Sequence, residues 1–512
     1  MNPGQKYRII AMVGLFLLIL TIGPTILAQI SGPPGFVFEG FLLNPIDGAT
    51  YLAKMFQGWE GDWKYTLAFT PEPGQGAYLF VFYLFLGHLT RLTHLSLIAV
   101  FHFARFLAIV FLIFSLFNFI EKALPDPKWH TTAFVLAAFA SGMGWLAIPF
   151  GGFTSDFWVA EMYPFLSAYA TPHFALGLGL LLWIITPQAT LEAGTQRLPW
   201  IYALAALLLA LISPFGVVLA LLVLGSRLII ELWPLSLNKF HLVLKSRFLW
   251  VLIASTPYLL YDIWLVANDP VLASWNAQNV TPSPPLWDLL LSLSPFLWLA
   301  IPGAISTIRR KQAAGLTLVL WAGIGLLLVY FPFSLQRRFL MGILVPVVAL
   351  AIVGLDWLAR GSVKRFKLFS LIVLGLAIPT NLVVLLTGIH AIQTHDERIY
   401  MTSGEVQAFQ WLRTHTDRDA LILAGPQTGL LIPAFTGRRV IYGHPFETPQ
   451  AEMAEAQVIQ FYETGDPSIL QNYPVQLIFY GPRETFLNPS FPLPDLDPVY
   501  RAGGVSIYAS LP

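Results

Sequence analysis

Long apolar runs separated by short polar segments fill the first three quarters of the chain. Each run has about the 20 residues that a helix needs to cross the hydrocarbon core of a bilayer, and the runs are too continuous for β-barrel strands. The pattern therefore predicts an all-α polytopic membrane bundle of about 12–13 transmembrane helices. Twelve of them are expected at roughly 8–30, 76–93, 95–120, 131–150, 165–186, 199–212, 214–233, 248–268, 285–307, 313–333, 338–359 and 368–391.

After about residue 392 the pattern becomes that of a soluble domain. A capping signal at Ser403 and Glu405 predicts the start of a helix. Short apolar runs predict strands at 420–424, 439–442, 475–480 and 505–509, with a helix at about 450–463. The sequence thus divides into a membrane domain, 1–392, and a small soluble α/β domain, 393–512.

The composition agrees with a membrane protein and excludes some chemistry. Hydrophobic residues make up 56% of the chain and charged residues 11%, whereas an ordinary globular domain is about a quarter charged. The absence of cysteine excludes disulfides, thiol nucleophiles and cysteine-ligated metals, so a metal would need His, Asp or Glu. A net charge of +1 gives no reason to expect a nucleic-acid partner.

Lysine and arginine near the span ends predict the topology. The basic clusters at 309–311 and 360–367 are expected on the cytoplasmic side of the plasma membrane. This places a first outer loop, 31–75, and a second, 151–164, on the outer side, together with the C-terminal domain. For this topology residues 76–120 must cross the membrane an odd number of times, whereas two spans are predicted there, so there is a parity conflict. A half-span or a missed break is therefore expected between 76 and 150.

The first outer loop carries the densest group of polar and aromatic residues. Asp47 lies one turn before Tyr51 on a segment that could form an interfacial helix, and Glu72 follows in a loop rich in Gly and Pro. One interpretation is a solvated loop with aromatic anchors at the level of the lipid headgroups. The other is that Asp47 is a catalytic base or metal ligand at the membrane surface, with Tyr51 and Glu72 beside an acceptor.

The second outer loop offers a further set of candidate groups. Asp156, Glu161 and His173 lie near the predicted membrane surface, where carboxylates and an imidazole could hold a divalent cation or assist a hydroxyl nucleophile. For His173 the alternative is a polar group that satisfies the start of a helix after Pro172. These residues, with Asp47, are the candidate metal ligands.

Three arginines are candidates for binding an anion. Arg337 and Arg338 are adjacent at an outer span end, where a pair of guanidinium groups suits a phosphate, although snorkelling to the headgroups is the alternative. Arg105 lies inside an apolar run, and a charge within the membrane usually marks a cavity or a partner.

In the C-terminal domain, His444 and Glu447 follow a predicted strand, where sites in α/β layers are usually found. The structural interpretation is that these two side chains fix their loop by hydrogen bonds. The functional interpretation is that the loop helps to select an acceptor.

The order of these features resembles that of the GT-C superfamily of membrane glycosyltransferases. A first span is followed by a long outer loop with the sequence IDGATY at 46–51, a Pro/Gly-rich entry to the next span, many further spans and an exported C-terminal domain. The resemblance covers the whole architecture and is closest in kind to protein mannosyltransferases and bacterial enzymes that modify lipid A. It implies a polyprenyl-phosphate-linked sugar as donor, and an acid at the position of Asp47 that acts at the acceptor or at a divalent metal such as Mg²⁺ or Mn²⁺. Many relatives have Asp-Asp or Asp-Glu where this chain has Asp47-Gly48.

The sequence is consistent with two functions. The first is transfer of a sugar from a lipid phosphate to a glycan, lipid or protein acceptor at the outer face of a bacterial plasma membrane. Asp47 would act as the base, Asp156 or Glu161 would orient the acceptor or hold a metal, and Arg338 would stabilise the phosphate. The second is a non-enzymatic membrane protein, either a transporter or flippase of lipid or polysaccharide, or a degenerate scaffold.

Overall fold

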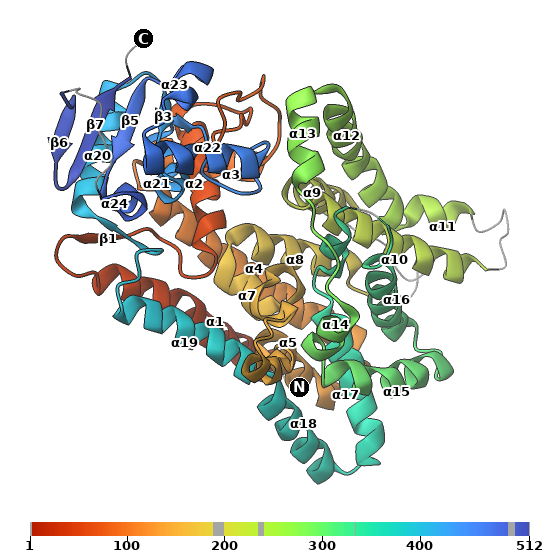
Figure 1. The fold of residues 1–512 in the computed structure, drawn as a ribbon. Helices are drawn as coiled ribbons and strands as arrows, with labels where there is room; N and C mark the ends of the chain where they lie inside the picture. Colours follow the sequence, from red (N-terminus) through yellow and green to blue (C-terminus); the bar gives the residue numbers. More distant parts are fainter. Residues whose placement is uncertain (1–2, 188–198, 234–239, 333, 490–496, 511–512) are drawn as a thin grey trace. The chain divides into compact units, whose positions relative to one another are not determined.

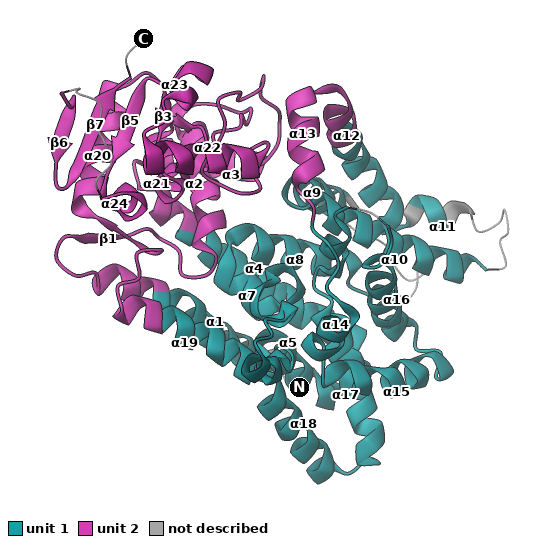
Figure 2. Ribbon diagram, in the orientation of Figure 1, with its two compact units in different colours: residues 1–24, 102–261, 281–389 teal, residues 25–101, 262–280, 390–512 magenta. Residues whose placement is uncertain are grey.

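A computed structural model describes residues 3–187, 199–233, 240–332, 334–489 and 497–510. These residues form two compact units (Figure 2). Unit 1 contains residues 1–24, 102–261 and 281–389, and unit 2 contains residues 25–101, 262–280 and 390–512. Unit 2 therefore combines the first loop with the C-terminal residues.

Unit 1 is helical (Figure 1). Its elements, some of which extend into unit 2, are α1 (Pro3–Ile30), α4 (Leu97–Ala123), η1 (Pro127–Trp129), α5 (His130–Phe139), η2 (Gly144–Phe150), α6 (Ser155–Trp158), η3 (Ala160–Met162), α7 (Pro164–Ala170), α8 (Pro172–Ile185), α9 (Pro199–Ile212), α10 (Pro214–Leu232), α11 (Phe240–Lys245), α12 (Arg247–Asn268), α14 (Leu286–Ser292), α15 (Phe296–Arg309), α16 (Ala313–Leu328), η5 (Gln336–Leu340), α17 (Leu344–Ala359), α18 (Val363–Ala377) and α19 (Pro379–Gln393).

Six stretches of the described chain are long and apolar enough to cross a membrane: Gly4–Ile30, Leu97–Ala123, Pro127–Phe150, Pro214–Leu232, Arg247–Asn268 and Val363–Gln393. A seventh, α14 with α15, is bent by 79°. Four apolar helices are shorter: Pro172–Ile185, Trp200–Ile212, Ala313–Leu328 and Leu344–Ala359. These helices confirm the prediction of a polytopic membrane bundle, but six or seven spans of the described chain, rather than about 12–13, are long and apolar enough to cross a membrane.

Large apolar side chains on these helices are exposed, as expected for a surface that faces lipid. Leu15 and Ile19 of α1, Ile263 and Trp264 of α12, and Leu371 of α18 each have more than half of their surface accessible. A water-soluble monomer rarely exposes apolar surface on this scale, because its contact with water is unfavourable. The protein is therefore an integral membrane protein.

The predicted span at 76–93 is wrong. These residues contain α3 (Val81–Thr93), which has 13 residues and is not among the candidate spans of the described chain. A Cβ at Gly58 of α2 (Pro45–Glu60) would lie 2.1 Å from the carbonyl oxygen of Leu84, and one at Gly87 would lie 2.0 Å from that of Met55. The two helices thus pack backbone against backbone. With one crossing fewer before 123, the parity conflict in the predicted topology disappears.

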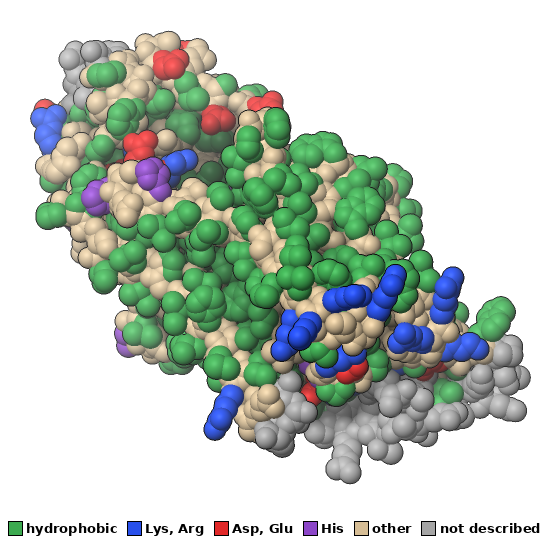
Figure 3. All heavy atoms as spheres, turned by 90° about the horizontal axis from the view of Figure 1, so that it is seen from below, with side chains coloured by type: hydrophobic (Ala, Val, Ile, Leu, Met, Phe, Trp, Pro, Cys, Tyr) green, Lys and Arg blue, Asp and Glu red, His purple; other side chains and the backbone are tan. Residues whose placement is uncertain are grey.

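Basic side chains gather at one end of a largely hydrophobic face (Figure 3). In unit 1 the turn after α15 contains Arg310 and Lys311, while α18 begins with Lys364 and Arg365 close after Arg360. Clustered lysine and arginine at helix ends is typical of the cytoplasmic side of a membrane protein.

Unit 2 is an α/β structure. Besides α2 and α3 it contains β1 (Phe36–Phe38), α13 (Pro270–Gln278), β2 (Tyr400–Thr402), α20 (Ser403–His415), β3 (Leu421–Leu423), α21 (Pro426–Thr436), β4 (Arg439–Val440), α22 (Ala451–Thr464), α23 (Ser468–Asn472), β5 (Leu477–Tyr480), α24 (Pro482–Leu487), β6 (Tyr500–Ala502) and β7 (Val505–Ala509). The five-stranded sheet has the order β4-β3-β5-β7-β6. Strands β4, β3 and β5 are parallel, and β7 runs antiparallel to β5 and β6. The predicted small sheet is therefore confirmed.

Helices cover both faces of this sheet (Figure 1), as the alternation of side chains along its strands requires. Ile422 of β3 lies in a core with residues of α20 and α21, whereas Leu421 and Leu423 lie in the opposite core with residues of α22. Ala53 of α2 and Phe69 of the first loop belong to the first of these cores. The first loop is thus part of the same hydrophobic core as the C-terminal sheet.

A second, smaller sheet joins the first loop to the strand that precedes α20. Strand β1 is antiparallel to β2, with Val37 opposite Met401. The hydroxyl of Tyr400 donates to the carbonyl of Ala28 at 3.0 Å. Strands this short were not visible in the sequence pattern, because three residues carry too little alternation to be recognised.

Candidate functional site

The first turn of α2 holds Asp47. Asn44 is the N-cap, with φ 51°, and its side-chain oxygen accepts from the backbone N–H of Asp47 at 3.4 Å. Asn44 Nδ2 donates to Asp47 Oδ2 at 2.5 Å. A carboxylate in the first turn is stabilised by the positive end of the helix dipole. The Asp47 side chain remains 40% exposed, so its position is fixed while it stays open to other molecules.

Asp47 also contacts His444, although 397 residues separate them in sequence. His444 is buried, and its Nε2 lies 3.3 Å from Asp47 Oδ1. Its Nδ1 accepts from the backbone N–H groups of Phe446 and Glu447, at 3.1 and 3.2 Å. Because Nδ1 accepts, the ring proton is assigned to Nε2, which donates it to Asp47.

The loop that carries His444 is attached to α2 by a buried ion pair. Lys54 is 1% exposed and its Nζ lies 2.7 Å from Glu447 Oε1. Tyr65 donates to Glu447 Oε2 at 2.9 Å, and burial raises the pKa of Tyr65, to which the adjacent carboxylate adds. The ring of Phe80 lies 4.2 Å from Lys54 Nζ. A buried charge pair with both partners hydrogen-bonded fixes geometry more than it adds stability.

Two other predicted cavity residues also lie in unit 2. Tyr51 stacks on Tyr83 with ring centroids 4.5 Å apart, and its ring faces Lys54 at 5.5 Å. Glu72 is exposed, and its backbone N–H donates to Thr70 Oγ1 at 3.2 Å. The structure thus groups Asp47, His444, Glu447 and Tyr51 along α2. None of the described contacts joins Glu72 to this group.

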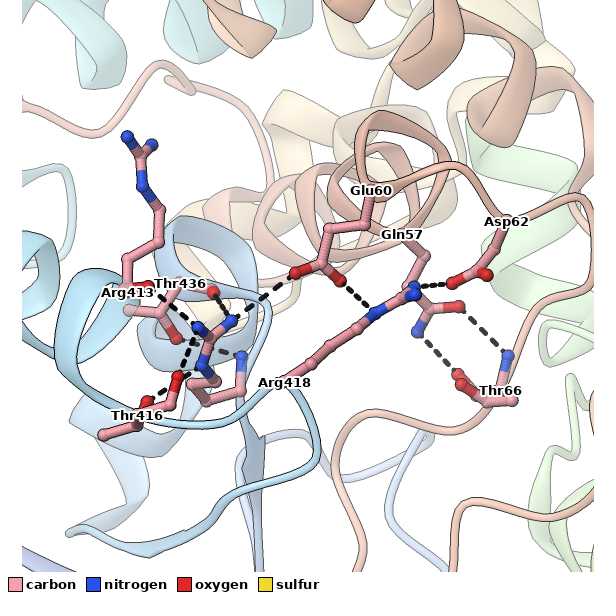
Figure 4. Close-up of polar contacts among 9 residues, drawn as sticks. Gln57, Glu60, Asp62, Thr66, Arg413, Thr416, Arg418 and Thr436 are labelled. Carbon is pink, nitrogen blue, oxygen red and sulfur yellow. Dashed lines mark hydrogen bonds and ion pairs between the residues drawn. The ribbon is translucent and has the colours of Figure 1, made fainter.

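The far end of α2 is fixed by a network of charges (Figure 4). Glu60 lies 2.7 Å from Arg418 Nε and 3.4 Å from Arg438 Nη1, and Arg418 also pairs with Asp62. Burial raises the pKa of Glu60, and the two arginines oppose that shift. Gln57 exchanges two hydrogen bonds with the backbone of Thr66, at 2.8 and 3.0 Å. Both ends of α2 are therefore joined to the first loop or to the sheet region.

In unit 1, Asp156 is fully buried and its carboxylate is used within the protein. Oδ2 accepts from the backbone N–H groups of Gly142 and Gly144 at 3.2 and 3.0 Å, and Oδ1 accepts from Thr154 and Ser292 at 2.6 and 3.2 Å. A Cβ on Gly144 would lie 2.0 Å from Asp156 Oδ1. Burial raises the pKa of Asp156 despite these hydrogen bonds. These hydrogen bonds are typical of a carboxylate that holds its own loop in a fixed conformation.

Glu161 and the arginine pair are also in unit 1. Arg338 Nη1 lies 3.6 Å from Glu161 Oε1, with the arginine side chain 36% exposed. The guanidinium of Arg337 stacks over the ring of Trp158 at 4.6 Å. Arg338 is thus partly exposed beside a carboxylate, and Arg337 is packed on an aromatic ring.

Arg105 and His173 have local partners within unit 1. Arg105 in α4 is buried and donates to the backbone carbonyls of Tyr169 and Thr21, at 2.9 and 3.1 Å. His173 Nδ1 lies 2.9 Å from Thr171 Oγ1 in the first turn of α8, and its ring packs on Phe174. The contacts of His173 agree with the structural alternative for that residue, and Arg105 has backbone carbonyls as partners.

Several buried polar residues lie beside the predicted ones and were not predicted from the sequence. Lys54 and Tyr65 contact Glu447, and Asp288 accepts from the Ser155 backbone N–H at 2.8 Å and from its hydroxyl at 2.9 Å. Lys54 is the first basic residue after Arg8 and stands inside an apolar stretch of α2. A lone charge within such a stretch is the signal that could have identified it.

The predicted metal ligands do not gather into a cation site in the part of the chain that the structure describes. There, no cluster of three or more His, Asp or Glu side chains could hold a metal ion. Both oxygens of Asp156 accept protein hydrogen bonds, and Asp47 has the imidazole of His444 as a donor rather than as a metal ligand. Within each unit, the described residues therefore do not fit a resident divalent metal.

The fold of the chain is similar to that of solved GT-C glycosyltransferases. The chain is similar to a crystal structure of the Archaeoglobus fulgidus oligosaccharyltransferase tethered with an acceptor peptide. The identity is 13% and the TM-score 0.56, over 94% of this chain and 69% of that one.

Two further solved structures have the same fold. Archaeal oligosaccharyltransferase AglB from Archaeoglobus fulgidus, in complex with an inhibitory peptide and a dolichol-phosphate, is 13% identical with a TM-score of 0.51, over 93% of this chain and 69% of that one. Arabinofuranosyltransferase AftD from Mycobacteria is 15% identical with a TM-score of 0.50, over 98% of this chain and 40% of that one. No protein-family model and no curated protein matches the chain. The likeness confirms the predicted resemblance at the level of fold.

Proposed function

We propose that the protein is a glycosyltransferase that moves a sugar from a polyprenyl-phosphate-linked donor to an acceptor hydroxyl at the outer membrane surface. The contact of Asp47 with His444 is the observation that carries this proposal. It gives the first loop a carboxylate that is fixed from two sides, by Asn44 and by His444, and is still 40% exposed. A carboxylate in this state is suited to act as a general base.

The reaction is a single displacement. Asp47 takes the proton of the acceptor hydroxyl while the acceptor oxygen bonds to the anomeric carbon of the donor sugar. The bond from that carbon to the phosphate oxygen breaks, and polyprenyl phosphate leaves as an anion without needing an acid. His444 donates its Nε2–H to Asp47 Oδ1 and so keeps the carboxylate oriented for the proton transfer. The step inverts the configuration of the anomeric carbon.

The donor phosphate is assigned to Arg338 and Arg337. Arg338 is partly exposed, and its guanidinium can form two parallel hydrogen bonds with a phosphate while Glu161 limits its mobility. The structural neighbour AglB was solved with a dolichol-phosphate, which supports a lipid phosphate as leaving group. Arg105 is assigned no role in donor binding, because backbone carbonyls take its hydrogen bonds.

The proposal includes the sidedness of the protein. Residues 1–392 form the membrane domain and residues 393–512 the exported domain, so that the first loop, which shares a core with the sheet, is also exported. The basic ends of α15 and α18 then face the cytoplasm.

The test is the effect of Asp47→Asn on sugar transfer by the purified protein in proteoliposomes, with a panel of polyprenyl-phosphate sugars. We expect a loss of at least about 10²-fold, the usual contribution of a general base, with an unchanged melting temperature. Asp497→Asn, at an exposed position, is the matched control and should retain wild-type turnover. Full turnover in Asp47→Asn would exclude Asp47 as the base.

A further inference from the structure

A groove of about 600 Å³ opens in unit 2 beside the loop that carries His444. Its lining includes Pro445 and Phe446 of this loop, Gln278 at the end of α13, and Glu452, Met453 and Glu455 of α22. Ligand-binding pockets usually have volumes of about 300–1,000 Å³. The groove therefore has the size of a site for a small or medium-sized molecule.

The wall of the groove is held in place by hydrogen bonds. Gln278 Nε2 donates to the carbonyl of Thr448 at 2.5 Å, and Gln278 Oε1 accepts from the backbone N–H of Gln450 at 2.9 Å. The backbone N–H of Phe446 donates to His444 Nδ1 at 3.1 Å. One short loop thus carries both the aromatic ring that lines the groove and the imidazole that contacts Asp47.

The lining combines apolar surface with hydrogen-bond acceptors. Phe446 and Met453 are each about half exposed, at 51% and 50%. Glu452 is exposed, and Glu455 accepts from the hydroxyl of Tyr442, which leaves further lone pairs on its carboxylate. The described lining contains two carboxylates and neither lysine nor arginine. Its charge is therefore unfavourable for phosphates and other anions.

We propose that this groove binds a carbohydrate acceptor whose sugar rings are not anionic. A sugar ring has an apolar face of C–H groups, which packs on an aromatic ring, and a rim of hydroxyl groups, which donate to carboxylates. Phe446 provides the ring, and Glu452 and Glu455 provide the acceptors. An acyl chain would leave these carboxylates without hydrogen-bond donors, at a cost on desolvation.

The inference rests on the proposed function, since a hydroxyl held in the groove lies against the loop that positions Asp47. It names the substrate class that the sequence left open among glycan, lipid and protein. It also gives the half-exposed ring of Phe446 a binding partner, because the C–H face of a sugar packs on an aromatic ring.

The test uses the full chain in nanodiscs on a microarray of neutral, amino and acidic oligosaccharides, followed by measurement of Kd for the glycan that binds best. Phe446→Ala should weaken binding about tenfold, and Glu452→Gln about three- to tenfold. Phe486→Ala and Glu463→Gln are matched controls, since both residues are exposed in unit 2 outside the groove lining, and they should leave Kd unchanged.

Glycan binding that responds to the groove variants and not to the controls supports the inference. Absence of glycan binding by the wild type, equal binding by all variants, or preferred binding of acidic sugars overturns it. Asp47→Asn should still bind the glycan, because Asp47 does not line the groove. If that variant retained sugar transfer while Phe446→Ala lost binding, the assignment of the base would fail and the acceptor groove would stand.

Discussion

His444 makes two kinds of hydrogen bond, and substitutions can separate them. Nδ1 accepts from the backbone of its own loop, and Nε2 donates to Asp47. Asparagine offers an acceptor near the position of Nδ1, whereas glutamine offers a donor near that of Nε2. A role limited to the loop and a role in positioning Asp47 therefore predict opposite orders of activity for the two variants.

We expect His444→Asn to keep the loop folded and lose the hydrogen bond to Asp47, so kcat should fall roughly 10-fold or more while KM and Tm change little. His444→Gln should keep more of the activity even if its Tm is lower. The measurements are kcat, KM and Tm of both variants in the same lipid. If activity simply followed Tm in both variants, His444 would only hold the loop.

The types of the residues at this site could be predicted from the sequence, but not their pairing. Asp47 was predicted because it lies in a polar loop at the expected membrane surface, and His444 because it follows a predicted strand of the C-terminal domain. No local pattern indicates that residues 397 positions apart meet. Lys54 escaped notice because an amphipathic helix normally turns its lysines toward solvent, and this one faces a buried partner.

At the scale of elements, α2 is held against the sheet region by the Lys54–Glu447 pair. Lys54→Met would leave the carboxylate of Glu447 buried without its cation, so we expect a loss of about 3–5 kcal/mol in the free energy of unfolding. The double variant Lys54→Met, Glu447→Gln removes both charges and should recover most of that loss. Thermal unfolding in detergent checks this, and an unchanged Tm in the single variant would show that the pair does not join these elements.

The stability of the region around strands β1 and β2 should depend on pH through the carboxyl group of Glu39. Burial raises the pKa of this carboxyl to about 8, although Arg483 lies 3.0 Å away and opposes the shift. Because the folded state then holds a proton that the unfolded chain has released, stability is highest below the unfolded pKa and is lost as pH rises toward 8.

The comparison variant is Glu39→Gln, which cannot titrate at this position. Between pH 5 and 8 the Tm of the wild type should fall relative to that of Glu39→Gln. Parallel Tm curves for the two proteins would mean that Glu39 titrates alike in the folded and unfolded states.

Hydrophobic pattern alone was sufficient for many elements and misleading for several predicted spans. The predicted spans 165–186 and 285–307 are each divided into two helices, α7 with α8 and α14 with α15. Strands β3, β5 and β7 and helices α20 and α22 lie where apolar runs and helical spacing predicted them. A membrane span was predicted at the position of helix α3 because residues 76–93 form an apolar run, whereas the helix has only 13 residues and packs closely on α2. The strand pair β1–β2 depends on a contact between distant segments, which sequence pattern does not encode.

For the whole molecule, the account requires the first loop and the C-terminal sheet to be on the same side of the membrane. Both contribute to one hydrophobic core, so a membrane cannot separate them. Reporter fusions at Gly61 and at Gly465 should therefore both report export, whereas a fusion near Lys311 should report the cytoplasm. Opposite signals from Gly61 and Gly465 would contradict the fold of unit 2, and two cytoplasmic signals would contradict the proposed sidedness.

The most direct measurement counts polyprenyl phosphate released and sugar incorporated in the same proteoliposomes. Displacement at the anomeric carbon frees one lipid phosphate for each sugar transferred, and it requires the carboxylate of Asp47. We expect equal amounts of the two products with the wild type and with Asp497→Asn, and neither product with Asp47→Asn. Movement of the intact donor across the bilayer without release of polyprenyl phosphate would contradict it and identify a transporter.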